Sequence, residues 1–246
     1  MPISRPTAAL DLPSRFRLVT SREVGDAFAH ASAIAHDAGA GTLVYVGRFD
    51  VAEFAVVLEP EEPLHAARGV FYAGCTALVD ALAVHAPPGT PIALEWPDTI
   101  HVGGRRVGGV RLGWPDGADE SKPADWLVFG GVIRTIAMGE AEPGLRPLGA
   151  MREAERFDDA DSGRLVESFA RHLTMAIDAW REHGFRKAAQ RYLLRLMPEL
   201  DARREIDDNG DLLVRRTGGV AVERRALVPS LLRPSWLDPA TGGLRR

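Results

Sequence analysis

The 246-residue chain is predicted to adopt an α+β fold, in which a mixed β-sheet is flanked by helices and a small β module follows. Two observations predict this class. Helical and strand-like stretches are interspersed along the first 198 residues, which is typical of an α+β domain. After Pro198 the pattern changes to short strands separated by sharp turns. We therefore expect two domains, at residues 1–198 and 199–246.

Apolar runs and helical patterns supply the first predicted elements. An entry strand is expected within residues 10–20 and a helix over residues 22–38. Residues 42–58 contain two apolar runs that predict buried strands, and residues 47–50 between them have the length of a tight hairpin turn. Residues 65–85 are apolar with many small side chains, which predicts a second, buried helix.

Residues 91–114 predict a β-hairpin that is kinked at Pro97, with Gly103 and Gly104 as its turn. On both sides of this turn apolar residues recur at alternate or near-alternate positions, namely Leu94, Trp96, Ile100, Val102, Val107, Val110 and Leu112. Such alternation is typical of strands that have one buried face.

A buried strand and two helices are predicted for the second half of the larger domain. Residues 115–123 are polar and turn-rich, and residues 125–138 then form an apolar run with a Gly-Gly break. Residues 161–182 carry apolar side chains at helical spacing, Gly184 lies just past their end, and a further helix follows. In the small module, residues 207–211 predict a sharp turn before a strand.

Composition and charge exclude several classes of partner. The net charge is −4 and the arginines are dispersed, so no basic face for nucleic acid is expected. No continuous apolar run approaches the roughly 20 residues of a membrane span, and the N-terminus lacks the apolar core of a signal peptide. We therefore expect neither nucleic acid nor a membrane as a partner, and a cytoplasmic location.

The cysteine and histidine content predicts no metal site. A single cysteine, Cys75, excludes an intramolecular disulfide and a cysteine-based cluster, and its helix predicts a buried side chain. His30 and His36 lie six positions apart, so they do not share one helix face at a spacing of three or four. His101 is expected at the surface, as a strand residue between two apolar neighbours.

Residues 96–98, Trp-Pro-Asp, and the pair at 108–109, Gly-Gly, resemble a motif of the biotin/lipoate protein ligase family. That motif is Lys-Trp-Pro-Asn-Asp, a short strand, Gly-Arg-Lys and then Ala-Gly. The resemblance extends over residues 20–230 in the order of the elements. It implies a ligase-type mixed sheet in a catalytic-type domain, followed by an SH3-like β module.

Four positions of the motif depart from the family pattern. Glu95 stands where biotin ligases carry the lysine that contacts the acyl-adenylate. Asp98 and Thr99 stand where they carry asparagine and aspartate, and Arg106 replaces the lysine of Gly-Arg-Lys. Both lysines of the chain lie after residue 120, and arginine does not replace lysine where a compact charge or a neutral amine is needed.

A further departure lies between the two buried strands of residues 42–58. Biotin ligases place a Gly-Arg-rich loop there, which orders over the adenylate phosphate. Only residues 47–50, Gly-Arg-Phe-Asp, remain here. A loop of this length is too short to fold over a nucleotide.

The resemblance implies a ligand wall in the motif segment. Its members are Trp96, Gly108 and Gly109, and glycine lets the backbone approach the ligand closely. Glu95 and Asp98 belong to the same pocket and make it acidic. A carboxylate beside a phosphate repels it, so these two residues oppose the binding of an adenylate.

Three arginines are the candidate contacts for anionic groups: Arg48, Arg106 and Arg134. Arg106 is the catalytic candidate, because it takes the place of the missing lysine and its planar fork pairs with phosphate or carboxylate. The alternatives are a solvated side chain for Arg48 and a structural salt bridge for Arg134. Lys122, in the loop after the hairpin, is a second candidate to replace the lost amine.

Two functions from different classes follow from these residues. The first is a biotin/lipoate protein ligase-like protein that binds, activates and transfers a carboxylic acyl group such as biotin, lipoate or octanoate to a carrier-protein lysine. This function implies ATP and Mg²⁺ as cofactors and a biotinyl or lipoyl carrier domain as a partner. The second is a catalytically degenerate binding or interaction protein on the ligase scaffold, which the acidic pair Glu95 and Asp98 favours.

Overall fold

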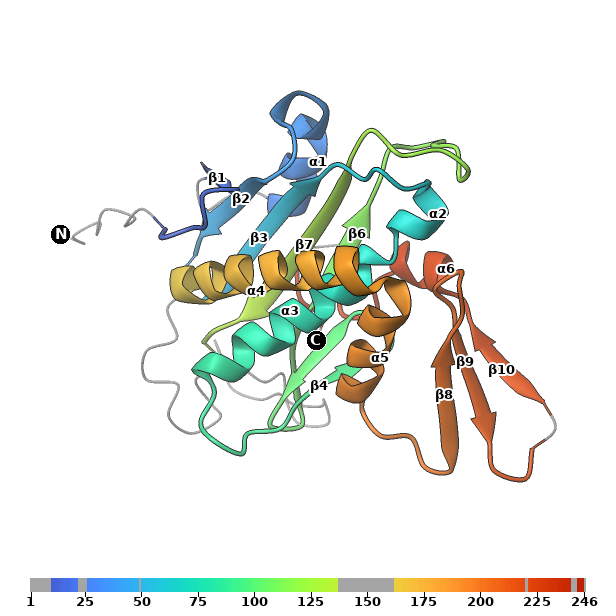
Figure 1. Ribbon diagram of the computed structural model, residues 1–246. Helices are drawn as coiled ribbons and strands as arrows, with labels where there is room; N and C mark the ends of the chain where they lie inside the picture. Colours follow the sequence, from blue (N-terminus) through green and yellow to red (C-terminus); the bar gives the residue numbers. More distant parts are fainter. Residues whose placement is uncertain are drawn as a thin grey trace.

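The computed structural model describes residues 10–21, 26–48, 50–136, 162–219, 221–239 and 243–245, and the structural statements below concern these residues. They form two β-sheets with six helices (Figure 1). In chain order the elements are β1 (Arg17–Ser21), α1 (Ala27–Ala38), β2 (Thr42–Gly47), β3 (Val51–Leu58), α2 (Leu64–Ala67), α3 (Val70–His85), β4 (Ile92–Glu95), β5 (Thr99–Val102), β6 (Arg105–Gly113), β7 (Leu127–Arg134), α4 (Ser162–His183), α5 (Phe185–Arg195), β8 (Ala202–Ile206), β9 (Leu212–Arg216), β10 (Val222–Arg225) and α6 (Leu227–Leu231).

The larger sheet has seven strands in the order β1-β2-β3-β7-β6-β5-β4. Strand β1 pairs in parallel with β2, and the other neighbours pair antiparallel. The predicted α+β class with a mixed sheet flanked by helices is therefore confirmed.

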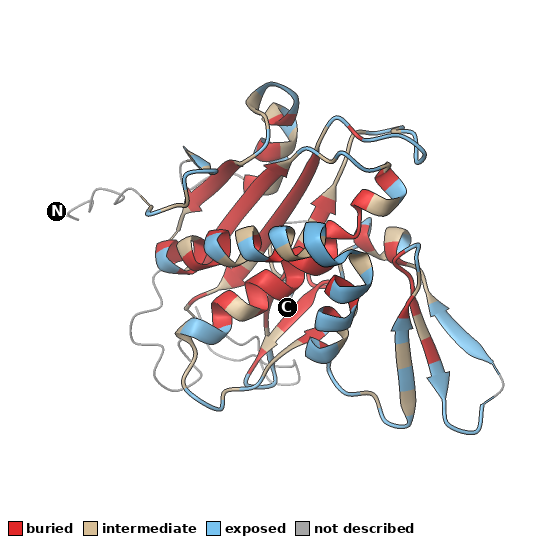
Figure 2. Ribbon diagram, in the orientation of Figure 1, coloured by how far each residue is buried: buried red, intermediate tan, exposed pale blue. Residues whose placement is uncertain are grey.

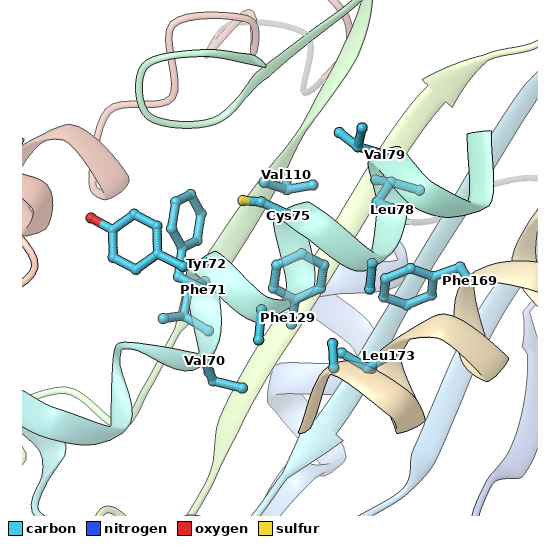
Figure 3. Packing of buried hydrophobic residues seen from close by; sticks show 14 of the residues in the cluster. Val70, Phe71, Tyr72, Cys75, Leu78, Val79, Val110, Phe129, Phe169 and Leu173 are labelled. Carbon is cyan, nitrogen blue, oxygen red and sulfur yellow. The ribbon is translucent and has the colours of Figure 1, made fainter. Parts of the chain in front are cut away.

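One face of this sheet, here called the α3 face, is covered by α3 and α4 (Figures 1 and 2). Almost every residue of α3 is buried, because the helix lies between the sheet and α4. Figure 3 shows Cys75 in this layer beside Phe71, Val110 and Phe129. Cys75 is fully buried, as predicted, and burial raises the pKa of its thiol well above the ordinary value.

The opposite face, here called the α1 face, is covered by α1 chiefly over β2, β3 and β7. Alanines along α1 let the helix pack closely against valines of these strands. The helix begins at Asp26, whose side chain accepts hydrogen bonds from the backbone N–H groups of Phe28 and Ala29 at 2.9 and 3.1 Å. Strands β4, β5 and the start of β6 lie beyond this helix.

Residues 91–114 form three strands, and the prediction of one kinked hairpin was wrong. Strand β4 pairs antiparallel with β5, so Pro97 lies in a tight turn between them. Gly103 and Gly104, both with positive φ, make a second turn before β6. The physical reason is that proline has a fixed φ and no N–H to donate, so it suits a turn better than a paired strand.

The smaller sheet is an antiparallel meander of β8, β9 and β10 beside α5 (Figure 1). The predicted turn at 207–211 is present, and Asp207 Oδ1 accepts hydrogen bonds from the backbone N–H groups of Asn209 and Asp211. The hydroxyl of Tyr72 on α3 donates to the Gly210 carbonyl and so connects this helix to the turn between β8 and β9. After α6 the chain returns to the large sheet. The domain boundary near residue 198 and the SH3-like character of the module remain predictions.

One stretch, Leu64–His85, has the length and composition of a membrane span. It comprises α2 and α3, and 83% of its most apolar window is buried inside the protein. The core helix of a soluble protein has the same properties. The expectation that no apolar run approaches the length of a membrane span was therefore wrong. That no membrane is a partner remains a prediction.

Candidate functional site

A row of five residues crosses the α1 face from β3 to β4. The strand register pairs Glu53 with Val132, Val132 with Gly109, Gly109 with Thr99, and Thr99 with Glu95. Because side chains alternate along a strand, and the sequence neighbours of these residues belong to the core on the α3 face, all five positions share the α1 face. The row therefore has a carboxylate at each end and a glycine at its centre.

The first end of the row is built around Glu53, which is buried against the N-terminus of α1. Its Oε1 accepts a hydrogen bond from the backbone N–H of Ala27 at 2.8 Å. Burial, with the nearby charge of Asp26 as a smaller cause, raises the pKa of the Glu53 carboxyl. Arg111 pairs with Asp26 at 2.5 Å, and its guanidinium lies 4.3 Å from the centroid of the Phe28 ring. This end of the row thus combines a buried carboxylate, Glu53, with the nearby ion pair of Arg111 and Asp26.

The centre of the row is covered by Trp236, which comes from the segment after α6. The indole is fully buried, and its Nε1 donates to the Val110 carbonyl at 3.2 Å. A Cβ at Gly109 would overlap this indole, so only glycine fits beneath it. A Cβ at Gly108 would instead overlap the carbonyl oxygen of Val132 in the neighbouring strand. Gly109 therefore makes room for the Trp236 indole, whereas Gly108 makes room for the backbone of the neighbouring strand.

Trp96 lies on the other side of the sheet from Gly109. Its ring packs against Tyr72 and Tyr192, with centroid distances of 6.2 and 6.0 Å. The hydroxyl of Tyr192 donates to the Pro97 carbonyl at 2.6 Å and holds the turn in place. The structure therefore does not bring Trp96 and Gly108 to the surface that Gly109 faces, because Trp96 follows Glu95 and Gly108 precedes Gly109, and successive residues face opposite sides of the sheet.

At the second end of the row, Glu95 interacts with His101. Their Oε2 and Nε2 atoms are 2.9 Å apart. The side chain of His101 is only 12% exposed, so the expectation of a surface residue was wrong. Arg106 faces His101 across the strand pair, and its guanidinium donates to the backbone carbonyl of Arg245 at 2.5 Å. The motif-lysine position is thus occupied by a carboxylate that has a histidine partner.

Asp98 is fully buried next to this end of the row. Its Oδ1 accepts from the hydroxyl of Thr99 at 3.1 Å and lies 3.5 Å from that of Ser235, whereas Oδ2 has no hydrogen-bond partner among the described residues. Burial raises the pKa of Asp98 to about 7, the charge of Glu95 adds to this effect, and the two hydroxyl contacts oppose it. Asp98 therefore changes its charge near neutral pH.

The other predicted cationic residues are placed apart from one another. Arg48 forms a two-point pair with Asp50, at 3.2 and 3.1 Å. Arg134 is the last residue of β7 and, by strand alternation, shares the α1 face with Gly109. Lys122 is exposed, and its Nζ lies 3.5 Å from Asp119 on the loop that contacts α2. Of the three arginines that the sequence predicts as contacts for anionic groups, Arg106 and Arg134 thus lie on this face, beside the centre of the row.

Several residues of this face were not among the sequence candidates. They are Asp26, Glu53, Arg111, Ser235, Trp236 and Arg245. Glu53 had a signal, since it is a lone carboxylate inside the apolar strand β3. Trp236 had a weaker one, as an isolated aromatic residue between Ser235 and the end of the chain. Within the described parts of the chain, no group of three His, Cys, Asp or Glu side chains could hold a metal ion.

The fold is that of a protein with a mixed β-sheet, one face of which is covered partly by the short helix α1 and partly by the segment that carries Trp236. A sequence model of the biotin/lipoate A/B protein ligase family matches residues 12–194. The chain belongs to that family. None of the curated proteins compared with it matches.

Solved structures show the same fold. A biotin protein ligase-like protein of unknown function from Silicibacter sp. TM1040 is 26% identical with a TM-score of 0.76, and the match covers 89% of this chain and 97% of that one. A mutant biotin protein ligase from Aquifex aeolicus in complex with biotin is 13% identical with a TM-score of 0.64, covering 87% and 97%. The Aquifex aeolicus enzyme in complex with biotin and ATP is 12% identical with a TM-score of 0.60, covering 85% and 94%.

The contact between Gly109 and Trp236 predicts a difference between two neighbouring glycines. Gly109→Ala should lower the free energy of unfolding by about 1–3 kcal/mol in the native background, because the new methyl group meets the indole. In a Trp236→Ala background the same change should be nearly neutral. Gly108→Ala should destabilise both backgrounds equally, because its methyl group meets backbone. Urea unfolding of the six proteins measures this, and equal effects of Gly109→Ala in both backgrounds would contradict the contact.

The raised pKa of Asp98 predicts a pH-dependent stability difference between the native protein and Asp98→Asn. The folded-state pKa lies above the unfolded value, so the folded protein holds the proton more tightly, and this contribution is lost as pH rises from about 4 to about 7. As pH rises across this window, Asp98→Asn should therefore gain stability relative to the native protein by a few kcal/mol. The gain is on the order of 1.4 kcal/mol for each unit of pKa shift. Glu53 is present in both proteins, so its contribution to the pH dependence cancels in the difference. If the difference in unfolding free energy between the two proteins stays constant from pH 4 to 8, folding does not raise the pKa of Asp98, and the prediction is contradicted.

Proposed function

We propose that this protein binds a small carboxylic acid of the biotin, lipoate or octanoate class on the α1 face around Gly109, and that it does not activate the acid with ATP. The observation that carries the proposal is that Arg106 and Arg134, by strand register and alternation, share the face to which Gly109 belongs. A guanidinium pairs with a carboxylate through two parallel hydrogen bonds, and glycine leaves room for an apolar group beside it.

Family membership supports the ligand class. The Aquifex aeolicus relatives of the same fold were solved with biotin. An acid of this kind combines one carboxylate with an apolar chain or ring. The α1 face offers the matching combination, because Arg106 lies beside a surface against which the Trp236 indole already packs.

The charged groups around Gly109 do not fit a nucleotide. The short turn after β2 supplies Arg48, which is paired with Asp50. Glu95 occupies the motif-lysine position, and Glu53 closes the other end of the row, so two carboxylates would face a polyphosphate. Neither Lys122 nor Lys187 lies on this face, since Lys122 is on the loop beside α2 and Lys187 is on α5. Binding of the acid alone avoids the resulting repulsion.

A second function is favoured by the buried Trp236. A face that is already filled by the chain itself suits a protein whose ligase scaffold serves interaction rather than acyl binding. The two functions differ in one respect, namely whether any acid of the class binds to the face around Gly109.

Calorimetric titration separates these functions. Biotin, lipoate and octanoate are each titrated with and without ATP and Mg²⁺, using the native protein, Arg106→Gln and Arg105→Gln. We expect one acid to bind without help from ATP, and Arg106→Gln to weaken it about tenfold or more, because a charge-assisted hydrogen bond is lost. Arg105 is exposed and points away by strand alternation, so Arg105→Gln should bind like the native protein.

Two results would contradict the proposal. Binding that is strengthened by ATP would show that the activating chemistry of a ligase is present. The absence of binding for all three acids would leave the interaction function.

A further inference from the structure

The described residues 234–239 and 243–245, which follow α6, are here called the C-terminal loop. They form two arms that meet at an isolated bridge between Leu237 and Leu244. The backbone N–H of Asp238 donates to the Gly243 carbonyl at 2.9 Å, and that of Arg245 donates to the Trp236 carbonyl at 2.7 Å. These two hydrogen bonds join one arm to the other, and the described residues of both arms lie outside the strands of the two sheets.

Among the described residues, each contact of this loop with the large sheet involves a side chain. Trp236 packs on Gly109 and donates to the Val110 carbonyl. The hydroxyl of Ser235 lies 2.9 Å from that of Thr99. Arg106 donates to the Arg245 carbonyl. An attachment of this kind can open without breaking a β-ladder.

These contacts resemble those that the proposed acid would make. The Arg245 carbonyl is an oxygen acceptor for the Arg106 guanidinium, where a carboxylate would be a stronger acceptor. The Trp236 indole is an apolar ring system above Gly109, where the apolar part of the acid would lie. The loop therefore offers the same pair of groups, an acceptor oxygen and an apolar body, to the same two residues.

We propose that the C-terminal loop, through its described residues 234–239 and 243–245, is an internal competitor that must leave the face around Gly109 before the acid binds. This inference rests on the proposed function. The free energy of opening the loop reduces the apparent affinity for the acid, because only the open fraction of the protein is competent to bind. Trp236 contributes most to the closed state, since it is the fully buried side chain of the loop.

The experiment compares Trp236→Ala with the native full-length protein in calorimetric titrations of biotin, lipoate and octanoate. We expect at least tenfold tighter binding of the same acid to Trp236→Ala, because the closed state has lost its anchor. Trp180→Ala is the matched control. Trp180 is a partly buried tryptophan on α4, on the α3 side of the sheet, so its removal should leave the affinity unchanged. Equal or weaker binding to Trp236→Ala would overturn the inference, since Trp236 would then belong to the binding surface.

Hydrogen exchange of the native protein tests the loop independently of any ligand and of the folding of the variant. The amides of Asp238 and Arg245 should exchange through local opening, at rates that low denaturant concentrations do not change, and faster than the amides of β3 and β7. Exchange of these two amides only with global unfolding would overturn the inference. If the amides of Asp238 and Arg245 exchange locally and no acid binds to either protein, the proposed function fails, whereas the local opening of these two residues stands.

Discussion

The incomplete cover of the α1 face is the constraint on which this structure depends. Helix α1 has 12 residues and is therefore about 18 Å long, and strands lie roughly 4.8 Å apart, so one such helix spans only three or four of the seven strands. It packs on β2, β3 and β7. The remaining strands need another cover for their backbone and side chains. In this protein the segment that carries Trp236 provides it over Gly109.

Burial also governs the charges on and beside this face. It raises the pKa of Glu53 in the row and of Asp98 next to the far end of the row, because burial destabilises the ionised form of a carboxyl. Glu95 keeps more contact with solvent, with 59% of its side chain exposed, and has His101 as its partner. A face with this balance of charges suits one carboxylate beside Arg106 better than a nucleotide triphosphate.

Much of the fold was predictable because it depends on local patterns. The apolar runs of β2, β3 and β7 and the helical spacing of α4 are visible in single segments of sequence. The turn at Pro97 was missed because a tight turn and a kinked strand have the same pattern of apolar residues. The glycine pair at 108–109 was identified, but its two members face different neighbours, and alternation at a bulged strand pair is not visible in sequence.

The site was less predictable because its central contact joins residues far apart in the chain. Gly109 and Trp236 meet only after the small sheet has been formed and the chain has returned to the large one. Nothing local connects an isolated tryptophan near the C-terminal end to a glycine in β6. The carboxylates Glu53 and Glu95 likewise come to stand at the two ends of one row only through the register of five strands.

The NMR signal of the Trp236 indole N–H during a titration with octanoate shows directly whether the acid and the C-terminal loop share the face around Gly109. We expect a protected, hydrogen-bonded signal in the free protein, owing to the bond with the Val110 carbonyl, and loss of this protection as the acid binds. The Trp180 indole, on the α3 side of the sheet, should keep its signal and serves as the internal reference. A Trp236 indole that stays protected when the protein is saturated with acid would contradict the claim that ligand and loop share the face around Gly109.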